Sequence, residues 1–373
     1  MAHLEARKHV SPDSGFPITL HPSFNPKIRQ HSPPEPPRTE IVPEKDRALF
    51  ADPEKKALFA VAKRVDLTES VGTVLEDVQL SQLNGAQLDE LALLVTERGV
   101  VFFRDQDLTT EGQVELFGHY GILDRHPAQK DTQHVVIRGS REDHRELLKY
   151  TPWPSGDFHA DTSFEINPPS YSMLRMEEHP AVGGDTAWVS TYGLYDALSD
   201  AMKKFVDGLH AVHTSRLQYD TILDLWGTGP NRAPVDSHHP AVRSHPVTGL
   251  KALNVNPGFV TGFAELKKYE SDKLLDLFAY HIHSADDHAV RWKWSVGGVA
   301  MWDNRCTNHR VIPGTYEAPR RGIRTTVFGE KPYFDPTSEG RAERQKRLKE
   351  EEAKGKDTVE VVKMGGPDSF TPA

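Results

Sequence analysis

Short runs of β-branched and aromatic residues recur through the middle of the chain, separated by Gly, Pro, Asn and Asp. The runs are residues 73–78, 100–103, 170–176, 185–189, 298–302 and 323–328. Chains built from many such short strands fold into β-sandwiches or barrels. A doubly wound parallel sheet is disfavoured because no Gly-x-Gly-x-x-Gly follows any of these runs. The sequence therefore predicts a mainly β core, a sandwich or a barrel.

Four other stretches have helical periodicity and predict helices that flank this core. In the clearest of them, residues 86–98, the side chains of Leu88, Leu91, Ala92 and Val95 fall on one stripe, and Gly99 ends the pattern. The other three are residues 111–120, 192–208 and 271–284. The expected fold is mainly β with helical decoration.

The two ends of the chain differ in composition from its middle. Ten of the 27 prolines lie between Pro12 and Pro53, which predicts an extended arm over residues 1–55. Residues 337–373 carry eight basic and eight acidic residues, which predicts a short solvated helix and a frayed tail. Residues 56–336 are then expected to form one domain.

Charge and hydropathy restrict the partners and the compartment. The formal net charge is −9, so we expect neither nucleic acid nor an anionic membrane surface as a partner. The sequence has no apolar run long enough to cross a bilayer and no apolar leader at its start, so we expect a cytoplasmic protein. Its one cysteine, Cys306, excludes internal disulfides and fits a reducing compartment. We also consider a homo-oligomer.

A histidine and an aspartate stand two residues apart in the segment Phe158-His159-Ala160-Asp161. On a strand, residues i and i+2 project from the same face, so both side chains would point to one site. Two histidines and one carboxylate form the facial triad of non-haem Fe(II) oxygenases. The candidate third ligand is His309, which we expect at the rim of a sheet because it follows a strand and a polar turn.

Two arginines follow His309 after eleven and fifteen residues, at Arg320 and Arg324. An oxygen-activating iron site needs an electron-donating cosubstrate. If the cosubstrate is 2-oxoglutarate, its distal carboxylate needs a bidentate and permanently charged partner, which arginine supplies better than lysine. A hydroxyl beside that arginine would complete the clamp.

With these motifs the sequence resembles the TauD/TfdA-like family of Fe(II)- and 2-oxoglutarate-dependent dioxygenases, and most of all its fungal sulfonate dioxygenases. The resemblance covers residues 70–336, and its motifs lie at residues 159–161, 183–186, 302–309 and 320–332. It implies a double-stranded β-helix, or jelly-roll, of the cupin kind. It also implies iron ligands at His159, Asp161 and His309, and 2-oxoglutarate contacts from Thr186 and Arg320, with the adjacent Arg321 as the alternative to Arg320.

The resemblance also implies a substrate pocket. A histidine in a His-Pro pair, here His126, and Arg324 would hold a sulfonate, and Phe259 would form a wall of the pocket. The tyrosine and asparagine of taurine enzymes fall here on Gln129 and near Ser155. These departures argue against taurine itself but leave a sulfonate as the expected substrate.

The activity implied by the family is hydroxylation of an alkyl sulfonate at the carbon that bears sulfur, which releases sulfite and an aldehyde with succinate and CO2. Fe(II) is the expected metal, and 2-oxoglutarate and O2 are the expected cosubstrates. A first alternative keeps fold and cofactors but has a small carboxylate or another anionic metabolite as substrate. A second alternative is an inactive member that acts as a scaffold or binding protein through its proline arm.

Other histidines and the cysteine have simpler interpretations. His281 and His283 close a predicted helix and would face apart, which disfavours a metal site there. Residues 238–239 and His245 lie among prolines and are expected in loops. Cys306 is expected to be packed in the core.

Overall fold

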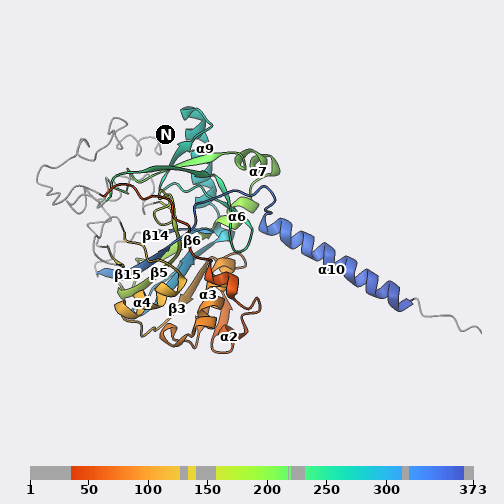
Figure 1. Cartoon of the computed structure of the whole chain (residues 1–373), viewed down its shortest axis with the longest axis horizontal. Coiled ribbons are helices and arrows are strands. Elements are labelled where there is room, and N and C mark those ends of the chain that lie inside the picture. Colours follow the sequence, from red (N-terminus) through yellow and green to blue (C-terminus); the bar gives the residue numbers. More distant parts are fainter. Residues whose placement is uncertain are drawn as a thin grey trace, which may run out of the picture.

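A seven-stranded sheet and a three-stranded sheet pack face to face at the centre of the molecule. Most helices lie on the outside (Figure 1). The computed structural model of the chain describes residues 35–126, 133–139, 157–216, 218–219, 232–312 and 319–364. Within these residues the predicted mainly β fold with flanking helices is confirmed, and its core is a jelly roll.

The larger sheet has seven strands in the order β1-β2-β3-β13-β5-β15-β4. All neighbours in it are antiparallel except β2 and β3. The strands are β1 Lys63–Asp66, β2 Thr73–Glu76, β3 Val100–Phe103, β13 Val299–Asp303, β5 Pro169–Glu178, β15 Arg320–Phe328 and β4 Val135–Gly139.

Three smaller sheets complete the β structure. One has the order β12-β6-β14, a second the order β11-β7-β8, and the third pairs β10 with β9. The strands are β12 Ala289–Trp292, β6 Thr186–Ser190, β14 Thr307–Val311, β11 Val260–Phe263, β7 His210–Thr214, β8 Asp236–Pro240, β9 Val242–Ser244 and β10 Lys251–Leu253.

Alternation along the central strands explains how the larger sheet is covered on both faces. In β3, Val101 and Phe103 pack into the cluster under α3, whereas Phe102 packs with Trp188 and Trp302 between the sheets. Successive side chains of a strand point to opposite faces, and a strand buried on both faces is apolar throughout. The run Val100–Phe103 therefore has no polar residue.

The helices agree with the sequence in three of four cases. The prediction for residues 192–208 was wrong, because two helices form there: the Ser199 hydroxyl accepts a hydrogen bond from the N–H of Met202 and starts a new helix. The helices are η2 Arg47–Phe50, α2 Lys56–Phe59, η3 Leu80–Gln82, α3 Gly85–Arg98, α4 Thr110–Phe117, η4 Gly118–Tyr120, α6 Thr191–Asp196, α7 Asp200–Val206, α9 Lys268–His283, η5 Asp286–His288 and α10 Arg341–Met364.

Helix α3 shows how local sequence sets an element that packs on the large sheet. Asn84 and Gln87 form a capping box at its start. Gly99 ends it with φ of +74°, and a Cβ there would lie 2.6 Å from the side chain of Thr307. Glycine is required at this position both by the backbone conformation and by the close approach of β14.

The two ends of the described chain relate differently to the core. Asp46 in the arm caps η2 and forms an ion pair of 2.7 Å with the buried Arg305. At the other end, α10 leaves the body of the molecule (Figure 1) and is longer than the short helix predicted from the sequence. Among the described residues, every helix is too short or too polar to span a bilayer.

Candidate metal centre

The three predicted metal ligands lie together between the sheets. Each of His159, Asp161 and His309 offers one ligand atom, and these atoms all lie within 4.8 Å of one another. Asp161 and His309 are 2% and 6% exposed. Two imidazole nitrogens and one carboxylate oxygen on a single site are the donor set of a non-haem Fe(II) centre.

The backbone brings the two histidines together. His159 N–H donates to the carbonyl of His309 over 3.0 Å, and His309 N–H donates to the carbonyl of His159 over 2.8 Å. The two imidazole rings are 4.4 Å apart between centroids. An isolated antiparallel bridge thus joins the segment of His159 to β14, a strand of the sheet β12-β6-β14.

One detail of the predicted ligand geometry was wrong. His159 and Asp161 do not share a strand, because Asp161 begins a turn and the next residue, Thr162, has φ of +38°. His309 lies in β14, an edge strand of the sheet β12-β6-β14, opposite Trp188 of β6. The positive φ of a β-branched residue beside a ligand is backbone strain of the kind that clusters at functional sites.

A hydrogen bond between its Nδ1 and a backbone carbonyl orients the His159 ring. Its Nδ1 lies 3.0 Å from the carbonyl oxygen of Asp157, which leaves Nε2 for a metal. The Asp157 carboxylate in turn contacts Nε2 of His283 at 2.8 Å. His281 bonds instead to the carbonyl of Leu194, so these two helix-end histidines face apart as predicted.

The protonation states suit a metal. Burial, with the neighbouring His159, lowers the pKa of His309 to about 3, and burial also lowers the pKa of His159. Burial alone would raise the pKa of Asp161, but Arg324 and the two histidines outweigh it and lower that pKa to about 2. Two neutral imidazoles and one carboxylate are the forms in which these side chains bind metals. The residues therefore fit Fe(II).

The predicted 2-oxoglutarate residues are also neighbours. Arg320 is 2% exposed, and its guanidinium donates to the carbonyl of Gly184 over 2.9 Å and to Thr186 Oγ1 over 3.3 Å. Trp294 Nε1–H donates to the same Oγ1 over 2.9 Å. Because two donors already point at this oxygen, the one hydroxyl proton of Thr186 is left to donate to a ligand.

Arg321 lies in a different environment from Arg320. Consecutive residues of a strand point to opposite faces, and the Arg321 side chain forms an ion pair with Glu177 and is 38% exposed. Of the two arginines, Arg320 is the one next to Thr186.

The three predicted substrate residues lie at the same centre. Arg324 Nη1 donates to Asp161 Oδ1, and Arg324 Nε is buried without a hydrogen-bond partner among the described residues. Burial, with Arg324 nearby, lowers the pKa of His126 to about 3. The Phe259 ring lies 5.6 Å from the ring of His159. Gln129 and Ser155 fall outside the described residues.

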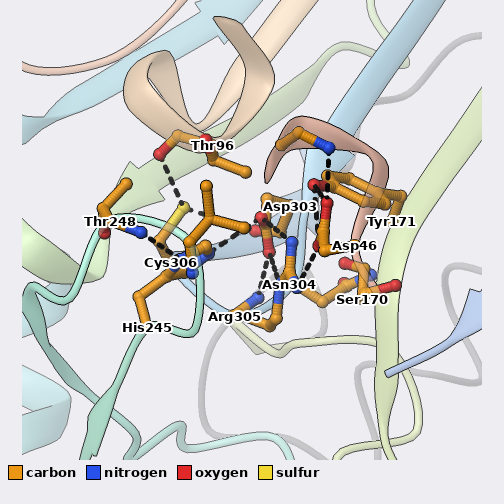
Figure 2. A network of polar contacts seen from close by, with 12 residues as sticks. Asp46, Thr96, Ser170, Tyr171, His245, Thr248, Asp303, Asn304, Arg305 and Cys306 are labelled. Carbon is orange, nitrogen blue, oxygen red and sulfur yellow. Dashed lines mark hydrogen bonds and ion pairs between the residues drawn. The ribbon is translucent and has the colours of Figure 1, made fainter. Parts of the chain in front are cut away.

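A second buried group, formed by His245, Asp303 and Cys306, has ligand-type atoms within 4.8 Å of one another (Figure 2). Arg305 donates to both oxygens of Asp303 at 2.9 and 2.7 Å, and His245 Nε2 lies 3.0 Å from Oδ2. Burial raises the pKa of the Cys306 thiol well above its usual value. Because both Asp303 oxygens already accept hydrogen bonds from Arg305 and the thiol stays protonated, we interpret this group as a structural network.

The expectation of loops was wrong for one of the two histidine segments. Residues 238–239 lie in β8, whereas His245 lies outside a strand, directly after β9, as expected. His245 is nevertheless fully buried, because the buried carboxylate of Asp303 needs a partner. Cys306 is packed in the core, as expected.

Comparison with known proteins agrees with this site. Residues 63–326 match the family described as "Taurine catabolism dioxygenase TauD, TfdA family". The alpha-ketoglutarate-dependent sulfonate dioxygenase of Saccharomyces cerevisiae is 36% identical over 307 residues, covering 78% of this chain and 74% of the relative. The alpha-ketoglutarate-dependent dioxygenase cnsP of Penicillium expansum is 36% identical over 297 residues, covering 76% and 80%.

Among solved structures, a taurine dioxygenase from Burkholderia xenovorans superimposes with a TM-score of 0.61 at 29% identity, covering 74% of this chain and 94% of that one. Sequence and fold thus point to the same relatives, and the predicted resemblance is confirmed. This chain belongs to the taurine catabolism dioxygenase TauD, TfdA family.

Proposed function

We propose that this 2-oxoglutarate-dependent dioxygenase hydroxylates a small organic sulfonate at the carbon that bears sulfur. The observation that carries the proposal is the position of Arg324, whose guanidinium donates a hydrogen bond to the proposed ligand Asp161. An anion bound by this guanidinium would have its neighbouring carbon close to the metal. A relative named as a sulfonate dioxygenase supports the same substrate class.

The proposed ligands are His159, Asp161 and His309, whose ligand atoms lie within 4.8 Å of one another. Fe(II), with 2-oxoglutarate and O2 as cosubstrates, supplies the oxidation, in which 2-oxoglutarate becomes succinate and CO2 and one oxygen atom goes to the substrate. The protein holds the reactants in place and keeps the two histidines neutral through burial.

Arg320 and Thr186 are proposed to hold the distal carboxylate of 2-oxoglutarate. The guanidinium supplies a fixed charge, and the Thr186 hydroxyl supplies the proton that Trp294 and Arg320 leave unused. Gly184 allows this placement, since a Cβ there would lie 3.2 Å from Arg320 Cδ.

Arg324 and His126 are proposed to hold the sulfonate, with Phe259 as a wall beside His159. His126 is neutral at physiological pH and can donate one N–H to an anionic oxygen. Hydroxylation converts the group CH2–SO3⁻ to CH(OH)–SO3⁻. Loss of sulfite from that carbon, with the hydroxyl proton, leaves an aldehyde.

The test pairs each sulfonate with the carboxylate of the same carbon skeleton and measures succinate and sulfite in parallel. We expect sulfonates to stimulate succinate formation and to release sulfite in equal amount. Stimulation by the carboxylates alone would favour a carboxylate substrate, because arginine binds either anion in the same fork. No stimulation by any compound, together with no Fe(II) binding, would favour the inactive scaffold.

A further inference from the structure

Two residues outside the proposed ligand set form hydrogen bonds with Asp161. Asp161 has two oxygens in different surroundings: Oδ1 lies 3.8 Å from His309 Nε2 and contacts Arg324, whereas Oδ2 accepts a hydrogen bond of 2.7 Å from the hydroxyl of Ser172. Only Oδ1 therefore faces the other proposed ligands.

Ser172 lies in β5, fully buried, and next to Asn304. Asn304 Nδ2 donates to Ser172 Oγ over 2.8 Å, and Asn304 Oδ1 accepts from the N–H of Asp161 over 3.1 Å. The ligand is thus held at its backbone by Asn304 and at its carboxylate by Ser172.

Two groups that can only donate, the Trp302 indole and the backbone N–H of Asp161, determine the directions of these hydrogen bonds. Trp302 Nε1–H can only donate, and it lies 3.0 Å from Asn304 Oδ1. The backbone N–H of Asp161 also can only donate, so the amide must present its oxygen to both and its NH2 to Ser172. Ser172 then has to accept from Asn304, and its single proton is directed to Asp161 Oδ2.

We propose that Asn304 and Ser172 are positioning residues that hold Asp161 as a one-oxygen ligand and keep its Oδ2 away from the metal. A carboxylate without this restraint can rotate and bind through both oxygens, which would fill a position that the reactants need. The inference rests on the proposed metal role of Asp161. It differs from the ligand set itself, because it concerns how many oxygens Asp161 contributes.

The matched variants are Ser172→Ala and Ser170→Ala. Both remove one buried hydroxyl from the same face of β5, but Ser170 Oγ donates to the carbonyl of Phe328 over 3.2 Å and not to Asp161. Asn304→Leu, which has the same branching at Cγ, removes the amide itself. The probes are Mn(II) for affinity and Co(II) for the visible spectrum, each added to the full chain without O2.

Ser172→Ala and Asn304→Leu are expected to weaken Mn(II) binding by about 10-fold, the range in which outer partners of metal ligands act. Their Co(II) absorption spectrum should also change, because a second carboxylate oxygen on the ion alters its ligand field. Ser170→Ala should match the wild type in both readouts.

Unchanged Mn(II) affinity and an unchanged Co(II) spectrum in Ser172→Ala would overturn the proposal. So would lower affinity without any spectral change, which is what destabilisation alone produces. Wild-type behaviour of Asn304→Leu beside an altered Ser172→Ala would overturn the part assigned to Asn304. Failure of the wild-type chain to bind Mn(II) would instead refute the metal centre.

Discussion

His159 and His309 are paired through both of their backbone hydrogen bonds, at 3.0 and 2.8 Å. A pair that exchanges both bonds has a fixed separation of its Cα atoms, about 5.5 Å in antiparallel sheets. The backbone pairing therefore fixes the separation of the two proposed nitrogen ligands, while the third proposed ligand, Asp161, is held by separate contacts.

The first prediction concerns the ligands. Replacing His159 by Ala should abolish both Mn(II) binding and conversion of 2-oxoglutarate to succinate, because two ligands remain where three are needed. The control is His210→Ala, since the His210 side chain is half exposed and its ring contacts Glu265, away from the proposed ligands. Wild-type succinate formation by His159→Ala would contradict the assigned centre.

A second prediction separates two neighbouring arginines. Arg320→Gln removes a charge-assisted hydrogen bond of about 1.5–3 kcal/mol and should raise the KM for 2-oxoglutarate by about 10- to 100-fold. Arg321→Gln should leave that KM unchanged, because the Arg321 side chain pairs with Glu177 and is 38% exposed. Steady-state kinetics of both variants with varied 2-oxoglutarate checks this. The reverse order of effects would assign the cosubstrate to Arg321.

The buried network of Figure 2 leads to a third prediction, on stability. Arg305 contacts both Asp303 and Asp46 at 2.7 Å. Arg305→Leu leaves a carboxylate buried without its cation and should lower the free energy of unfolding by about 3–5 kcal/mol. Urea unfolding measures the difference. Arg64→Leu, which breaks a half-exposed pair with Asp66, should have little effect.

The fourth prediction concerns acid stability. Burial lowers the pKa of His239 to about 4, and burial also lowers the pKa of His213 well below its usual value. Below about pH 6.5 the unfolded chain binds protons at these positions and the folded protein does not, so stability falls as the pH decreases from 6.5 towards 4. Each such histidine should cost about 2 kcal/mol at pH 5.

Urea unfolding at pH 8 and pH 5 tests this. His239 bonds through Nε2 to the carbonyl of Glu165, and His239→Gln keeps a donor while removing the titrating group. This variant should lose less stability between the two pH values than the wild type. An equal loss in both proteins would show that other groups cause the acid sensitivity.

The candidate residues of the site could be proposed from the sequence because their types and their order are typical of this chemistry. His159 and Asp161 stand two residues apart, His309 follows much later, and two arginines follow His309. Their local backbone was harder to predict. Residues 307–311 are largely polar and do not look like a strand, yet they pair with β6 along their length and bury His309, the proposed ligand.

Other features depend on contacts between distant residues. Nothing near Ser172 or Asn304 in the sequence indicates that they meet at Asp161, because the three lie on separate segments joined only by the fold. The division of residues 192–208 into two helices follows from one capping serine, Ser199, within an otherwise helical pattern. Local periodicity cannot weigh such a cap against continuation of the helix.

The contact of Asp46 with the core also bears on where a self-sufficient fragment can begin. The family match starts at residue 63, but Asp46 accepts hydrogen bonds from the Tyr171 hydroxyl and from Arg305. A fragment trimmed to the family boundary would leave an interior cation and an interior phenol short of their acceptor. We therefore expect the shortest stable enzyme to begin before Asp46, upstream of the region by which its relatives are recognised.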